Sequence, residues 1–120
     1  MLALHSENQY CLYRKSTDMR KSFDGLCGIV ESELKRSATS GEVFIFINKR
    51  KDRIKLLKWQ EGGFELYYKR LEQGTFELPK ASGSARSSAV VWPDLVMMIE
   101  GIPLVSDRKK RKRFRPQKQP

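Results

Sequence analysis

The middle of the chain alternates between apolar and polar stretches at the spacing of short β-strands. Val43–Ile47 is apolar at every position, which is typical of a strand covered on both faces. Six polar residues follow, and 54–59 then resumes β character. Gly62 and Gly63 allow a tight turn into a third strand, in which 64–69 alternates between apolar and polar faces. This pattern predicts a β-meander.

A stripe of apolar residues at helical spacing precedes the meander. Its members are Phe23, Leu26, Cys27, Val30 and Leu34. The stripe predicts a helix over Ser22–Lys35, with Asp18 or Ser22 as its cap. A short strand is expected upstream at Gln9–Tyr13. After the meander, Pro93 begins a second, short helix that Gly101 and Pro103 stop.

These elements predict an α+β fold with a mostly antiparallel sheet of about four strands, one packed helix, a short second helix and a disordered basic C-terminal tail. The expected divisions are a flexible N-terminus (1–8), an α+β core domain (9–79), a linker (80–91), a short helical segment (92–105) and the disordered tail (106–120). The expected core residues are Phe23, Leu26, Val30, Phe44, Phe46, Ile54, Leu56 and Leu66.

Positive charge is concentrated at the C-terminus. The chain has 120 residues and a net charge of +10, of which +8 lies in residues 108–120. A run of like charges repels itself and does not fold alone. The remainder of the chain is close to neutral, so the overall charge says little about the folded part.

A second group of basic residues lies in the first turn of the meander, where Lys49, Arg50, Lys51, Arg53 and Lys55 fall within seven residues. Charges this close repel one another unless an anion is bound, so we expect a nucleic-acid-binding surface; the alternative is a solvated hairpin tip. Possible extensions are Arg20, Lys21, Lys69 and Arg70. The tail residues expected to bind phosphates are Arg108, Lys109, Lys110, Arg111, Lys112, Arg113 and Arg115. Tyr67, on the polar face of its strand, is the expected stacking residue.

The sequence gives little support for a metal-binding, catalytic or membrane-spanning protein. Cys11 and Cys27 form no CxxC pair and have no histidine nearby, so we expect no metal site and no cofactor. His5 is the only histidine, which argues against a histidine-based mechanism. No stretch is long and apolar enough for a membrane span, so a cytoplasmic protein without membrane contact is expected. The short string Asp52-x-x-Lys55 is too weak to indicate a nuclease.

Several segments together resemble the TnpB accessory proteins of bacterial insertion sequences of the sixty-six family, which are unrelated to the RNA-guided nucleases of the same name. The matching residues are Thr17 to Arg20, Phe23 to Leu26, Gly41, Phe44, Phe46, Asn48 to Arg50, Asp52, Lys55, Trp59, Gly63, Phe64, Lys69 to Glu72, Gly74, Phe76 and Pro79, followed by the segment WPDLVMMIEGIPL. The resemblance runs from about Tyr10 to about Val105. Leu78 departs from it, because the family has a tryptophan there.

The resemblance implies a non-catalytic accessory protein of DNA transposition. The implied partners are DNA, bound with weak sequence specificity, the element's transposase and another accessory protein. Two alternatives stay open: a metal-dependent nuclease that uses Asp18, Asp24 and Asp52, and an adaptor that binds only proteins. The distance between the three carboxylates distinguishes the nuclease from the others, because a shared metal ion requires them to converge.

Deleting residues 108–120 is expected to weaken DNA binding and reduce its salt dependence. For every phosphate of duplex DNA that the protein no longer neutralises, the slope of log affinity against log salt falls by roughly 0.9. Titrations of both proteins at several salt concentrations measure this slope. An unchanged affinity and slope would show that the tail does not bind DNA.

Overall fold

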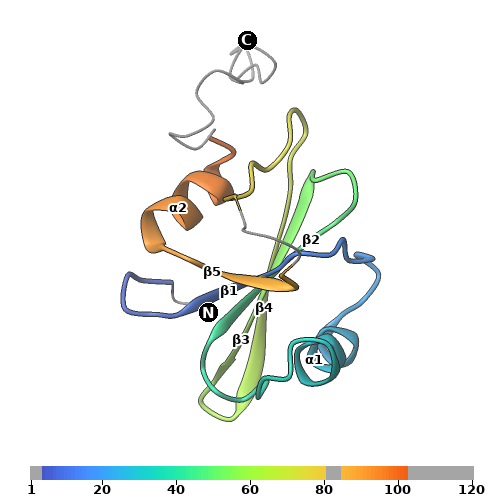
Figure 1. The fold of residues 1–120 in the computed structure, drawn as a ribbon, viewed down its shortest axis with the longest axis vertical. Coiled ribbons are helices and arrows are strands. Elements are labelled where there is room, and N and C mark those ends of the chain that lie inside the picture. Colours follow the sequence, from blue (N-terminus) through green and yellow to red (C-terminus); the bar gives the residue numbers. More distant parts are fainter. Residues whose placement is uncertain (1–3, 81–84, 103–120) are drawn as a thin grey trace.

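The computed structural model describes residues 4–80 and 85–102. Its elements are β1 (Tyr10–Tyr13), α1 (Phe23–Ser32), β2 (Val43–Ile47), β3 (Arg53–Gln60), β4 (Gly63–Arg70), β5 (Ser87–Val90) and α2 (Trp92–Glu100). The strands form one sheet in the order β4-β3-β2-β1-β5, with a helix on each of its faces (Figure 1). The α+β class is therefore confirmed.

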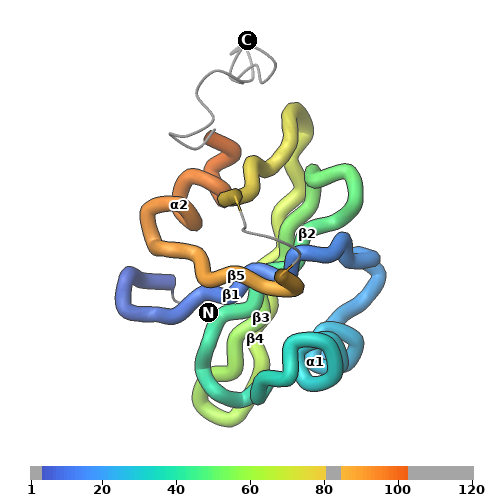
Figure 2. Tube along the Cα trace, in the orientation of Figure 1, coloured from blue at the N-terminus to red at the C-terminus, as the bar shows by residue number. Residues whose placement is uncertain are grey.

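The sheet is mostly antiparallel, as expected, but in the described part of the chain it has five strands where about four were predicted, and one of its four pairings is parallel. β1 and β2 run parallel, whereas β1 with β5, β2 with β3 and β3 with β4 pair antiparallel. Parallel neighbours need a long crossover connection, and here α1 provides it, as the chain path in Figure 2 shows. The β2–β3–β4 part is the predicted meander.

Two hydrophobic cores lie on opposite faces of the sheet. The core on the α1 side contains Cys11, Tyr13, Leu26, Val30, Ala38, Phe44, Phe46 and Leu57. The core on the α2 side contains Tyr10, Leu12, Val43, Ile45, Ile47, Ile54, Leu56, Phe76, Val90, Leu95 and Met98. β2 contributes to both cores and is buried at all five positions, as its uninterrupted apolar run predicts.

Two of the eight expected core residues are not fully buried. Phe23 is 42 % exposed, because it stands at the first position of α1 and only Leu26 and Val30 of that helix are fully buried. Leu66 is half-buried, packed against the α1-side core from the outermost strand β4. The helix also begins and ends inside the predicted range, with Glu33 at its C-cap.

Part of the expected linker is a strand. Residues 87–90 pair along their whole length with β1 and form the edge strand β5. Residues 4–8, expected to be flexible, begin with Leu4 against the α2-side core, and the Tyr10 hydroxyl donates to the His5 carbonyl at 2.8 Å. In both places, backbone pairing and packing hold a segment whose polar composition alone indicates a loop.

The C-terminal end of α2 is fixed by two contacts. Gly101 is the C-cap, with φ at 74°, a left-handed conformation that glycine adopts without strain. The Lys69 ammonium on β4 donates to the Ile99 carbonyl at 2.6 Å. Gly101 thus ends the helix as predicted, whereas Pro103 and the basic tail lie outside the described residues.

Truncating Phe44 to alanine is expected to lower the free energy of unfolding by roughly 3–5 kcal/mol, because removal of its buried ring leaves a cavity in the core. Phe23→Ala is the matched control and should cost less than about 1 kcal/mol, since Phe23 is 42 % exposed and its removal leaves no closed cavity. Urea denaturation of the three proteins gives both values. Equal losses at the two positions would contradict the assignment of the core.

Candidate nucleic-acid interface

The parallel pairing of β1 and β2 brings two loops together at one edge of the sheet. Both strands end at this edge, so the β1–α1 loop and the β2–β3 turn leave it side by side. The Thr17 N–H donates to the Ile47 carbonyl at 2.9 Å and continues the contact between the two segments beyond the strands.

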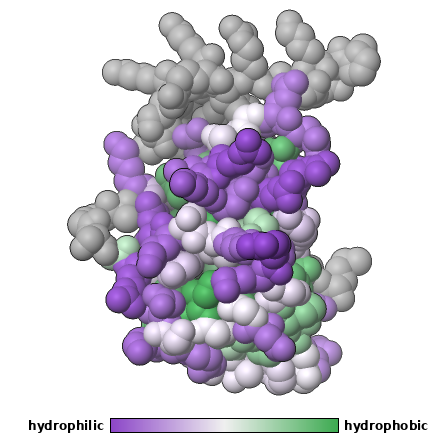
Figure 3. Space-filling model, turned by 90° about the vertical axis from the view of Figure 1, so that its right-hand side faces the viewer, coloured by the Kyte–Doolittle hydropathy of each residue, from purple (hydrophilic) through white to green (hydrophobic). Residues whose placement is uncertain are grey.

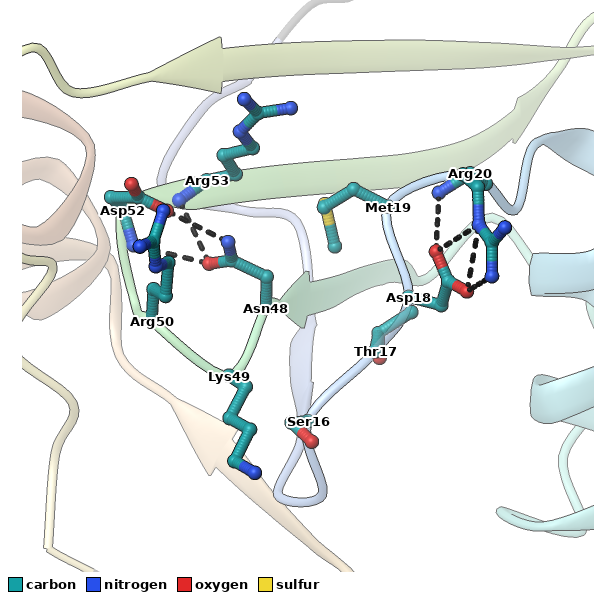
Figure 4. A pocket seen from close by; sticks show the side chains of 10 residues that line it. All are labelled: Ser16, Thr17, Asp18, Met19, Arg20, Asn48, Lys49, Arg50, Asp52 and Arg53. Atoms are coloured by element: carbon teal, nitrogen blue, oxygen red, sulfur yellow. Dashed lines mark hydrogen bonds and ion pairs between the residues drawn. The ribbon is translucent and has the colours of Figure 1, made fainter.

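An open depression of about 690 Å³ lies between these two loops. It is lined by Ser16, Thr17, Asp18, Met19, Arg20, Asn48, Lys49, Arg50, Asp52 and Arg53. Figure 4 shows the two segments facing each other across the gap, with Met19 between them. Four of the lining residues are cationic and two are anionic, so the depression favours an anionic ligand.

The β2–β3 turn is held in one conformation by its own hydrogen bonds. The Asn48 side-chain oxygen accepts from the N–H groups of Asp52 and Arg53 at 3.1 and 3.0 Å, and its amide donates to the Asp52 carboxylate at 2.7 Å. The Lys51 carbonyl accepts from the Phe76 N–H at 2.7 Å, and the Asp52 carbonyl from the Leu71 N–H at 2.8 Å. The cationic side chains of this turn therefore project from a backbone that these hydrogen bonds hold in one conformation.

On the opposite loop, Arg20 is already paired. Its guanidinium donates to both oxygens of Asp18, the shortest bond being 2.7 Å, and its backbone N–H donates to the same carboxylate. These side-chain and backbone bonds lower the pKa of Asp18 to about 2, so the carboxylate is charged at any ordinary pH. The pair is exposed, with 91 % of the Arg20 side chain open to solvent.

Lys55 does not belong to the surface of the depression. Its side chain is buried, and its ammonium donates to the carbonyls of Met19 and Lys21 at 2.9 and 2.7 Å. The same ammonium lies 4.7 Å from the ring centroid of Tyr68. Lys55 thus joins the β1–α1 loop to β3. The sequence instead predicts that its ammonium contacts a phosphate.

The residues suggested as extensions of the basic surface also differ in whether they are bonded within the fold or exposed. Lys69 is engaged at the end of α2, and Arg70 is exposed and paired with Glu72 at 2.8 Å. Lys21 is exposed beside the loop and lines a neighbouring depression along α1, of about 430 Å³. The basic residues 108–115 lie outside the described residues.

Sequence reasoning missed Arg14 and Lys15. Together with Lys49 and Lys51 they line a smaller depression of about 170 Å³, which has no acidic residue and adjoins the first through Ser16, Asn48 and Lys49. Arg14 is also anchored, donating to the Pro79 carbonyl at 2.8 Å. Their position directly after a strand, followed by a helix and a second strand, is the signal that could have placed them at this edge.

The two adjacent tyrosines of β4 lie on opposite faces of the sheet, and Tyr67 is on the covered face. Tyr67 packs against the α2-side core, where burial and the Glu100 carboxylate raise its pKa. Tyr68 is 49 % exposed on the other face. The expectation is wrong because α2 covers the face on which Tyr67 lies. Leu78, which departs from the family pattern, packs against this same core.

The three carboxylates of the nuclease alternative do not converge. Asp18 is paired with Arg20, Asp52 with Asn48, and Asp24 lies in the first turn of α1. Within residues 4–80 and 85–102 there is no group of three histidine, cysteine, aspartate or glutamate side chains that could hold a metal ion. The same described residues include no helix of a length and apolarity that would cross a membrane.

The surface on this side of the molecule is largely hydrophilic. The side of Figure 1 on which the β1–α1 loop and the β2–β3 turn project faces the viewer in Figure 3. Hydrophilic side chains cover much of the upper and middle part of its described area, whereas hydrophobic ones show lower down. Nine of the ten residues that line the depression are polar or charged.

Comparison with known proteins gives a family but no described activity. Two proteins of Sinorhizobium fredii, y4jC and y4hO, both described as uncharacterized, are 35 % and 37 % identical over 57 % and 58 % of this chain. These matches cover 58 % and 60 % of the relatives' own lengths. No solved structure matches. A family model described as IS66 Orf2 like protein matches residues 8–109, and the chain therefore belongs to the family of IS66 Orf2-like proteins.

Proposed function

We propose that this protein is a non-catalytic accessory factor of DNA transposition that holds nucleic acid by its phosphates in the depression between the β1–α1 loop and the β2–β3 turn. Family membership supports the role in transposition. The observation that supports the binding mode is the convergence of Arg20, Lys49, Arg50 and Arg53, from segments far apart in the sequence, on one open depression.

The arrangement suits a polyanion better than a single small anion. The two adjoining depressions share Lys49 and together extend the basic surface from Arg53 to Lys15. A polymer of phosphates can neutralise several of these charges at once and release its counterions on binding. Arg50 and Arg53 can also each present two N–H donors to a phosphate or a guanine edge.

The fixed conformation of the β2–β3 turn lowers the entropic cost of binding. Because Asn48 and the backbone bonds of Lys51 and Asp52 already hold the loop, a ligand does not have to order it. The same charges on an unstructured chain would lose more conformational entropy when they bind. Phosphate contacts position a nucleic acid without reading its sequence, which agrees with weak sequence specificity.

Strand cutting then falls to the element's transposase, which we propose as a protein partner together with the element's other accessory protein. The paired states of Asp18 and Asp52 support this division of labour, because both carboxylates are used to hold the walls of the depression. A metal-dependent reaction would need them to converge on one ion.

Arg50→Glu is expected to weaken DNA binding in the full chain and in the protein lacking residues 108–120. Removing the phosphate contact of Arg50 should lower the salt slope by roughly 0.9. Lys35→Glu changes the net charge equally, but it lies in the connection that enters the opposite end of β2, so its effect should be smaller. Fluorescence anisotropy with duplex DNA at several salt concentrations measures both. Equal effects of the two substitutions would show that the turn is only a solvated hairpin tip without a role in binding.

Asp18→Asn is expected to strengthen binding. The substitution removes a negative charge from the depression and weakens the pairing that now occupies the Arg20 guanidinium. Because the pKa of Asp18 is about 2, this gain should be the same at pH 6 and pH 8, where the native carboxylate is fully charged. Weaker binding by this variant would show that Arg20 needs Asp18 to hold it in a binding orientation.

A further inference from the structure

Tyr68 is an aromatic side chain that packs in neither hydrophobic core. It lies on β4 and pairs across the sheet with Lys55 of β3. Phe64 and Leu66, on the same face, pack against the α1-side core, whereas the Tyr68 side chain is 49 % exposed. About half of this side chain is therefore open to a ligand.

The ring is held at two points in spite of its exposure. The Lys55 ammonium lies over it, 4.7 Å from the centroid, and is itself fixed by two backbone carbonyls. The Arg53 guanidinium donates to the Tyr68 hydroxyl at 3.1 Å. One face of the ring is therefore occupied by a cation, so a base that stacks on the ring would have to use the opposite face.

The bond from Arg53 places the ring beside the phosphate-binding depression. Arg53 lines the depression and bonds to the hydroxyl of Tyr68, so a single side chain separates the two. A nucleotide whose phosphate lies near Arg53 therefore has its base within reach of an aromatic surface. In single-strand-binding proteins, basic grooves next to such rings hold the backbone and stack the bases.

We propose that Tyr68 is a stacking platform for an unpaired base, and that the nucleic acid held in the depression is single-stranded or locally unpaired. This inference rests on the proposed function and makes it more specific. In a duplex, neighbouring bases cover each other's faces, so only an unpaired base can offer a face to the ring. Because Lys55 and Arg53 already orient the ring, stacking costs little further conformational entropy.

The test compares three ligands of equal length: an oligothymidylate, an abasic oligonucleotide with the same phosphates, and a duplex. Tyr68→Leu keeps an apolar side chain over Lys55 but removes the aromatic face, and Tyr68→Phe keeps that face. Tyr68→Leu should lower the affinity for oligothymidylate by about five- to a hundredfold. It should leave the abasic and duplex affinities close to those of the native protein, and Tyr68→Phe should restore binding of oligothymidylate.

Fluorescence anisotropy at fixed salt gives the affinities, and thermal unfolding of each variant confirms that it is folded. An unchanged affinity of Tyr68→Leu for oligothymidylate would overturn the stacking role. An equal loss on all three ligands would also overturn it, since Tyr68 would then act only by positioning Arg53. In both cases Arg50→Glu would still weaken binding if the proposed function is correct. Failure of the native protein to bind any of the ligands would refute both proposals.

Discussion

The arrangement of the whole molecule depends on the parallel pairing of β1 with β2. Two parallel neighbours cannot be joined by a hairpin, so the chain must cross one face of the sheet, and α1 lies there as a result. The same pairing makes both strands end at one edge, from which the β1–α1 loop and the β2–β3 turn project. The depression between them is a consequence of strand direction, and the hydrogen bond from Thr17 to Ile47 joins the two segments.

Basic residues in this protein have two different physical roles. Lys55 and Lys69 are turned inward and use their ammonium groups on backbone carbonyls, where they join a loop to β3 and α2 to β4. Removing an ammonium from water costs on the order of several kcal/mol, and short bonds to carbonyls and a ring contact offset that cost. Lys49 and Arg50 are exposed at the turn and remain hydrated. Counting charges in the sequence cannot separate these roles.

Periodicity predicted the elements better than their arrangement. The apolar stripe located α1, the unbroken run of β2 indicated burial on both faces, and the basic turn was correctly placed between β2 and β3. Strand direction leaves no trace in the periodicity itself, and the strand–helix–strand order that indicates it was not used, so the parallel pair and the contribution of Arg14 and Lys15 to the basic surface were missed. The strand β5, with the sequence SSAV, owes its conformation to pairing with β1 and has little β-propensity of its own. The face on which Tyr67 lies was predicted wrongly because the position of α2 decides which face is covered.

The fixed end of α2 also determines where the remaining chain begins. Gly101 approaches Leu71 so closely that a Cβ atom would lie 3.3 Å from a Leu71 methyl group, and the Leu71 N–H is bonded to Asp52 of the basic turn. The described chain therefore ends, at Ile102, next to a residue that is hydrogen-bonded to the basic turn. If residues 108–115 bind phosphates as the sequence predicts, their binding to a nucleic acid already held in the depression would be intramolecular, governed by an effective concentration that the connecting length sets. Weak binding by each part would then add up to tight binding by the whole chain.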